Sequence, residues 1–127
     1  MQDKLISCET AKLAEEKGFK NKNYYFGYKD DKLVVKDQYP NTIKAYTQSL
    51  LQKWLREKHN IDVLIKYDSP VRPKYPIRYT FYIYTTLDWY SQHTYITFEE
   101  ALEAGLYEAL KLIKEWKIYL YHLKQQN

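Results

Sequence analysis

The side chains best suited to catalysis or metal binding are scattered along this sequence. The three histidines, His59, His93 and His122, lie in separate segments, and none is four residues from another, the spacing that places two metal ligands on one helix face. The sequence places no histidine or aspartate beside the single Cys8, so no partner is evident that could activate its thiol as a nucleophile. These patterns indicate neither a metal site nor a catalytic cysteine.

The sequence also lacks the elements of a phosphate-binding loop. Gly18, Gly27 and Gly105 lie far apart, so they cannot form a glycine-rich loop. The glutamates between Glu99 and Glu108 are better explained by helix capping and solvation than as a general acid and base. We therefore predict that the protein is not an enzyme and uses neither a cofactor nor a metal.

Cations gather in the middle of the chain, in the stretch TQSLLQKWLREKHNI (47–61) and the loop SPVRPKYP (69–76). A helix that covers a sheet needs a polar outer side, which is the simpler explanation for the cations of the first stretch. The loop prolines recur every three residues, so the loop could dock on a partner as a polyproline II strip or merely stiffen a connection. The candidate nucleic-acid contacts are Lys53, Arg56, Arg72 and Lys74.

Tyrosine dominates the composition, with fifteen residues against three glycines. Its apolar ring and polar tip suit either a half-buried sheet or an adhesive surface. The predicted partner-binding residues are Tyr82 and Tyr84 on a strand, and Trp116, Tyr119 and Leu120 near the C-terminus. A stacking platform for single-stranded bases and plain strand propensity are the alternatives for the strand tyrosines.

Three segments carry the end signals of helices. Ser7 caps a first helix that ends before Gly18, and Thr47 caps a second that ends at Asn60. A capping box that begins at Thr97 opens the third helix. Between them, alternating apolar and polar residues predict five strands, at 23–28, 32–36, 62–67, 78–86 and 89–96.

This order of elements predicts an α+β fold in one domain, 1–127. An N-terminal αββ part (1–45) would hold a hairpin around 29–31, and an αβββα part (46–127) would follow a flexible connection at 37–45. Short loops favour antiparallel pairing, and the helices would cover one face of the sheet in a two-layer arrangement. Tyr82 and Tyr84 would lie on the other face.

The last helix predicts contacts on more than one side. Its apolar residues include a heptad seam with alternating spacings of four and three, and further apolar residues fall outside that seam. A second copy of the chain could cover the remaining side, which predicts a homodimer, although Tyr24, Tyr25 and Phe26 could serve instead. The seam consists of Leu102, Leu106, Ala109, Ile113, Trp116, Leu120 and Leu123.

The net charge of +4 is mild and suits solubility as well as weak nucleic-acid binding. Residues 1–7 lack the apolar run of a signal peptide, and lysines interrupt the most apolar later stretch, so we expect no contact with a membrane. A lone cysteine is typical of a protein in a reducing cytoplasm.

Three blocks of this sequence resemble a family of small uncharacterised proteins encoded by phages and prophages of gut bacteria. They are TAKLAEEKGF (10–19), TQSLLQKWLREKHNI (47–61) and TFEEALEAGLYEALKLI (97–113). The family tends to have proline where this chain has Tyr46, and its members often stop near Ile113. The resemblance implies a phage context and the host cytoplasm, and carries over no activity.

The order αβββα also resembles a double-stranded RNA binding domain in architecture. Its first helix and first strand–strand loop would correspond to the segments that carry the four cations named above. Where such a domain has phosphate-binding lysines, this chain has Phe98, Glu99, Glu100 and Glu103, which would repel phosphate.

The prediction is therefore a non-enzymatic phage protein that binds a host or phage protein. The alternative is a nucleic-acid binding protein with a core like that of a double-stranded RNA binding domain.

Overall fold

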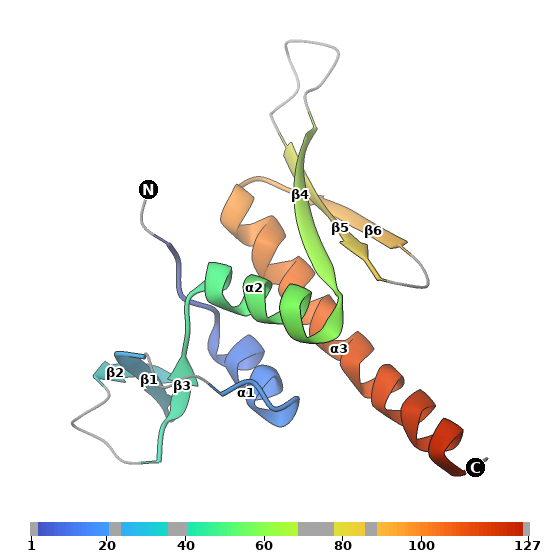
Figure 1. The fold of residues 1–127 in the computed structure, drawn as a ribbon. Coiled ribbons are helices and arrows are strands. Elements are labelled where there is room, and N and C mark those ends of the chain that lie inside the picture. The colour runs from blue at the N-terminus through green and yellow to red at the C-terminus, as the bar shows by residue number, and fades with distance from the viewer. Residues whose placement is uncertain (1–2, 21–23, 36–40, 69–77, 86–88, 126–127) are drawn as a thin grey trace.

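The computed structural model describes residues 3–20, 24–35, 41–68, 78–85 and 89–125, with side chains for all of these except 68, 89–93 and 114–125. This part of the chain forms a two-layer α+β fold with two antiparallel sheets (Figure 1), which confirms the predicted fold class. In chain order the elements are α1 (Cys8–Glu16), β1 (Phe26–Lys29), β2 (Lys32–Val35), β3 (Ile43–Ala45), α2 (Gln48–His59), β4 (Asp62–Asp68), β5 (Arg78–Tyr84), β6 (Trp89–Tyr95) and α3 (Phe98–Gln125).

The helix ends follow from local sequence. Ser7, Thr47 and Thr97 each precede a helix, and each side-chain oxygen accepts a hydrogen bond of 3.1–3.3 Å from the backbone N–H three residues later. Gly18 and Asn60, which follow α1 and α2, adopt left-handed φ angles of 92° and 54°. In both cases the N–H of the next residue bonds back to a carbonyl of the preceding helix. The predicted caps are confirmed.

The N-terminal sheet has the strand order β2-β1-β3. Asp30 and Asp31 join β1 to β2, and both have positive φ angles (51° and 63°), as a two-residue type I′ turn requires. The prediction of a flexible connection at 37–45 is wrong for Ile43–Ala45, which form β3. Antiparallel pairing with β1 stabilises a strand of only three residues, too short to show alternation in the sequence.

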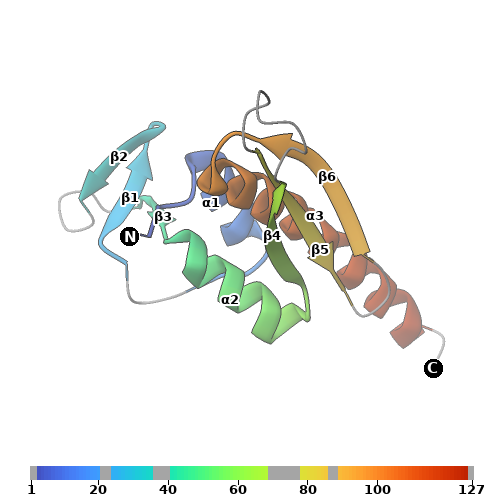
Figure 2. The ribbon, with the colours of Figure 1, turned by 90° about the horizontal axis from the view of Figure 1, so that it is seen from above.

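The second sheet has the order β4-β5-β6, with both pairs antiparallel. Val63, Phe81 and Ile83 lie on its covered face and are at most 2% exposed. Gly105 lets α3 approach this face closely, because a Cβ at that position would lie only 2.8 Å from Val63 and 3.0 Å from Phe81. α3 thus crosses the sheet directly, and α2 contacts both α3 and β4 (Figure 2).

The first half of the predicted heptad seam packs within the chain. Leu102, Leu106, Ala109 and Ile113 are at most 4% exposed, and Leu110, which falls outside the seam, is fully buried. α3 contacts α1 and α2 as well as the second sheet, so this half of the helix needs no second copy of the chain for cover. Its last turns extend away from the other elements in Figure 1.

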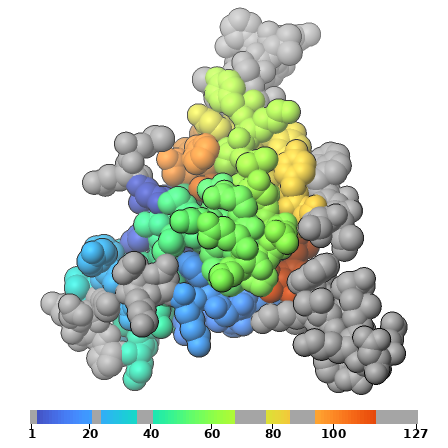
Figure 3. Space-filling view, viewed as in Figure 1, coloured from blue at the N-terminus to red at the C-terminus, as the bar shows by residue number. Residues whose placement is uncertain are grey.

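One hydrophobic core joins the two parts of the chain. Residues from 1–45 contribute Ile6, Ala11, Ala14 and Phe19, which pack in the same cluster as Leu51, Leu55 and the buried residues of α3. Tyr28 of β1 adds a polar tie, because its hydroxyl donates a hydrogen bond of 2.7 Å to the carbonyl of Ile6. In the space-filling view, α2 lies at the centre of the face shown, with α1 below it and β4 above (Figure 3).

Candidate functional site

The face of the β4-β5-β6 sheet opposite α3 presents apolar and aromatic side chains to solvent. Because side chains alternate along a strand, the residues between the buried positions of β4 and β5 lie on this face. Leu64 is 45% exposed and Tyr84 is 42% exposed, and Tyr82, directly opposite Leu64 in the register, is half-buried. We call Leu64, Lys66, Tyr82 and Tyr84 the open-face patch.

Ring contacts fix the tyrosines of the open-face patch. The rings of Tyr82 and Tyr84 have centroids 6.3 Å apart and planes inclined by 25°, an offset-stacked arrangement. Lys66 Nζ lies 5.5 Å from the centre of the Tyr82 ring, within the range of a cation–π contact. The patch is therefore an apolar surface with one cation. Its residues lie on β4 and β5, which pair without interruption, whereas the register between β5 and β6 shifts between Thr80 and Tyr82.

The structure brings together only part of the predicted partner-binding set. Tyr82 and Tyr84 are neighbours on the open face, as predicted. Trp116, Tyr119 and Leu120 lie in the last turns of α3, and their side chains fall outside the described residues. Leu64 and Lys66 were missed, although the same alternation that assigns Val63 and Ile65 to the covered face also places them on the open face.

Of the four cations predicted to contact nucleic acid, the structure likewise describes only two. Lys53 and Arg56 lie on the solvent side of α2, and each is more than half exposed. Lys53 Nζ lies 4.0 Å from a carboxylate oxygen of Glu57, and Arg56 Nη1 lies 3.9 Å from one of Asp62. These exposed pairs contribute little to stability, yet they place carboxylates beside the cations that would contact phosphate. Arg72 and Lys74 lie outside the described residues.

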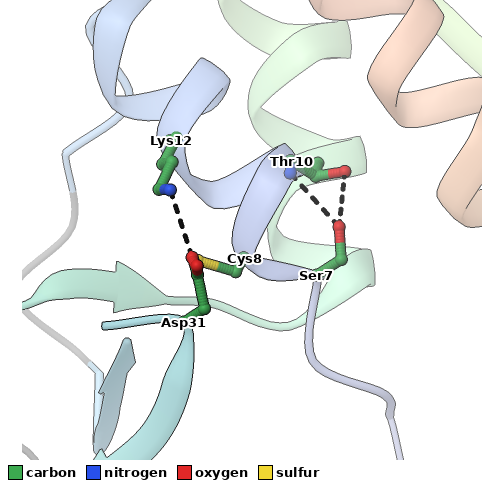
Figure 4. Close-up of polar contacts among 5 residues, drawn as sticks. All are labelled: Ser7, Cys8, Thr10, Lys12 and Asp31. Carbon is green, nitrogen blue, oxygen red and sulfur yellow. Dashed lines mark hydrogen bonds and ion pairs between the residues drawn. The ribbon is translucent and has the colours of Figure 1, made fainter. Parts of the chain in front are cut away.

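An aspartate lies beside Cys8, a neighbour that the sequence alone could not place. Asp31 Oδ1 is 3.3 Å from Cys8 Sγ and 3.2 Å from Lys12 Nζ (Figure 4). Burial, followed by the hydrogen bond to Asp31, raises the pKa of the Cys8 thiol above its ordinary value. The hydrogen bond from Lys12 lowers the pKa of Asp31. A raised pKa favours the protonated thiol, which donates to Asp31, and makes the thiolate less available as a nucleophile.

A second polar cluster connects the three helices. The Glu103 carboxylate of α3 accepts hydrogen bonds from the backbone N–H and the hydroxyl of Ser7, at 3.2 and 3.1 Å. It also accepts one of 3.3 Å from the buried Gln48 amide at the start of α2. Ser7 Oγ lies 3.1 Å from Thr10 Oγ1 as well (Figure 4). These contacts satisfy helix-end polar groups, so they explain Glu103 without a catalytic role.

A shallow, open groove of about 460 Å³ runs beside this cluster, between α1 and α3. Glu9, Glu100 and Glu103 line it together with Tyr95 and Tyr107. Among the described residues, no group of three histidine, cysteine or acidic side chains could hold a metal ion. Within the same residues, no helix is both long and apolar enough to cross a membrane.

Comparison with known proteins gives no relative from which a function could be transferred. No family model, no curated protein and no solved structure matches this sequence.

Proposed function

We propose that this protein is a non-enzymatic protein-binding module and that the open-face patch is its contact surface. The observation that carries the proposal is the exposure of Leu64 and Tyr84 on the face of the sheet that α3 does not cover, where the ring of Tyr84 also stacks with that of Tyr82. Tyrosine rings supply a large contact area at a small cost in side-chain entropy, and they are enriched among the residues that dominate protein interfaces.

The arrangement of the patch supports a protein partner over a nucleic acid. The patch carries one cation, Lys66, and that ammonium already lies over an aromatic ring. Phosphate binding requires several cations along one path. Lys53 and Arg56 lie on α2 instead, beside the carboxylates of Glu57 and Asp62. Nucleic-acid binding through a core like that of a double-stranded RNA binding domain is therefore the weaker alternative.

The resemblance of three sequence blocks to phage and prophage proteins suggests where such a module works. The proposed partner is a host or phage protein in the host cytoplasm. A small protein can alter a larger machine by occupying one of its surfaces, which requires contact area and no catalytic chemistry.

The test is a capture experiment from host lysate with three purified proteins. These are the wild-type chain, the double variant Leu64→Ser/Tyr84→Ser, and Ile96→Ser as a matched control. Ile96 is 65% exposed and lies outside the open-face patch, so its substitution removes a similar apolar side chain elsewhere. We expect the wild type and the control to retain the same protein after nuclease treatment, and the double variant to lose it.

A salt series separates the two functions. Raising the salt from about 0.1 M to about 0.5 M should leave the captured protein largely in place, whereas four phosphate contacts would lose roughly a hundredfold or more in affinity. Capture that disappears with nuclease, or that survives the loss of both patch residues, would contradict protein binding through this surface.

A further inference from the structure

The N-terminal sheet ends in an open strand. In the described part of the chain, β2 pairs with β1 on one side and with no strand on the other. Figure 2 shows β2 at the outer margin of the molecule, on the side of β1 away from the helices. An unpaired strand edge presents a row of backbone donors and acceptors that another extended segment can complete.

The hairpin geometry decides which backbone groups point outward. Lys29 and Lys32 flank the two-residue turn, and residues in this position form a hydrogen-bonded pair. Such pairs alternate along an antiparallel ladder, so the next hydrogen-bonded pair is Gly27 with Val34. The N–H and C=O groups of Leu33 and Val35 therefore point away from β1, towards the free edge.

An apolar strip lies along one face of this edge. Phe26 and Val35 are opposite each other, and Leu33 lies two residues from Val35 on the same face. They are 39%, 47% and 48% exposed, respectively. The remainder of this face is not free, because Tyr28 and Ile43 pack against the core. Phe26, Leu33 and Val35 thus lie beyond the part of this face that packs against the core.

The opposite face of the same sheet is basic. Lys29 and Lys32 stand directly opposite each other, and Lys44 of β3, which pairs with Gly27, lies on the same face. Opposite charges on neighbouring strands stabilise a sheet, so a carboxylate on a strand added next to Lys32 would be favourably placed.

We propose that the β2 edge binds an extended segment of a partner protein in which acidic residues alternate with apolar ones. The apolar side chains of this segment lie beside Leu33 and Val35, and its carboxylates lie beside Lys32 on the other face. A second copy of the chain fits less well, because its own β2 would add another Lys32 to a face that is already basic. The β2 edge and the open-face patch belong to different sheets, so a negative result for one proposal does not affect the other.

The probe is a fluorescently labelled peptide of alternating glutamate and valine, titrated with the full chain and followed by fluorescence anisotropy. A lysine–valine peptide of equal length is the charge-reversed comparison. Leu33→Pro removes an outward N–H that makes no bond to β1, so it should block strand addition without breaking the hairpin. Lys32→Glu reverses the charge beside the added strand, and Lys58→Glu makes the same charge change at an exposed position on α2.

We expect the wild type and Lys58→Glu to bind the glutamate–valine peptide with similar affinity. Lys32→Glu should bind it about three- to tenfold more weakly and should gain affinity for the lysine–valine peptide by a similar factor. Leu33→Pro should bind neither peptide, while its circular dichroism spectrum stays that of the wild type.

Three outcomes would overturn the proposal. One is the absence of binding to the glutamate–valine peptide, and another is equal binding by wild type and Lys32→Glu. The third is self-association in analytical ultracentrifugation that Leu33→Pro abolishes, because the edge would then bind a second copy of the chain. Lys32 is exposed, so its variant keeps the test decisive even if the proline variant fails to fold.

Discussion

Replacing Gly105 with alanine should destabilise the protein, although the same exchange stabilises most helices. In an exposed helix interior, alanine is favoured over glycine by about 1 kcal/mol. Here the added Cβ would lie 2.8 Å from Val63 Cγ1, 3.0 Å from Phe81 Cγ and 3.1 Å from Phe81 Cβ. These distances are about 0.4–0.7 Å shorter than the closest comfortable carbon–carbon contact of about 3.5 Å.

The contacts offer little room for adjustment. Val63 and Phe81 are fully buried, and two of the three atoms belong to the root of the Phe81 side chain, which cannot move without its strand. Overpacking of this kind costs about 1–3 kcal/mol. After the gain in helix propensity, we expect Gly105→Ala to lower the free energy of unfolding by roughly 0–2 kcal/mol, instead of raising it by about 1 kcal/mol.

Urea unfolding followed by circular dichroism measures this difference. Ala104→Gly, at the neighbouring and only partly buried position, gives the helix propensity term in the opposite direction. Gly105→Ala in a Val63→Ala background should lose part of its penalty, because one of the clashing atoms is gone. A Gly105→Ala protein that gains about 1 kcal/mol, as an ordinary helix position would, refutes the close packing of α3 on the sheet.

Three further predictions concern the polar contacts of α1. Ser7→Ala should lower the free energy of unfolding by about 1–2 kcal/mol in urea titrations, because this hydroxyl caps α1 and donates to Glu103; an unchanged midpoint would show that the cap is dispensable. Lys12→Met removes the donor that lowers the pKa of Asp31, and a lowered carboxyl pKa stabilises the fold above the ordinary pKa of the group. The stability difference from wild type should thus be present at about pH 7 and vanish as the pH falls through the lowered pKa of Asp31, and a difference that persists in acid would assign it to another cause. The Cys8 thiol, whose pKa is raised, should react with iodoacetamide more slowly than free cysteine at about pH 8, and an equal or faster rate would contradict the described contacts.

Local signals made most of the fold predictable. The caps at Ser7, Thr47 and Thr97 and the left-handed residues Gly18 and Asn60 depend on side chains within a few positions of each helix end. The alternation of strands β4 and β5 likewise assigns residues to two faces without reference to the rest of the chain. Both kinds of signal are properties of short segments. The folded protein keeps these local structures because its core forms where the segments place their apolar residues.

Contacts between segments that are distant in the sequence could not be predicted from local patterns. Strand β3 depends on pairing with β1, and the approach of Asp31 to Cys8 depends on how the hairpin packs against α1. Burial was also only partly predictable, because Tyr67 shares the covered side of β4 with Val63 and yet is 50% exposed. Alternation gives the face of a strand but does not say how far along the strand the covering helix reaches.

The shared core of the two sheets has a practical consequence for ligand discovery. Because α1 and the N-terminal hairpin pack into the same cluster as α2 and α3, we expect the chain to melt in one cooperative step. A compound or peptide that binds either surface then raises the melting temperature of the entire protein. One thermal-shift screen can therefore interrogate both surfaces at once, and substitutions at Lys32 or Tyr84 would reveal which of them a hit occupies.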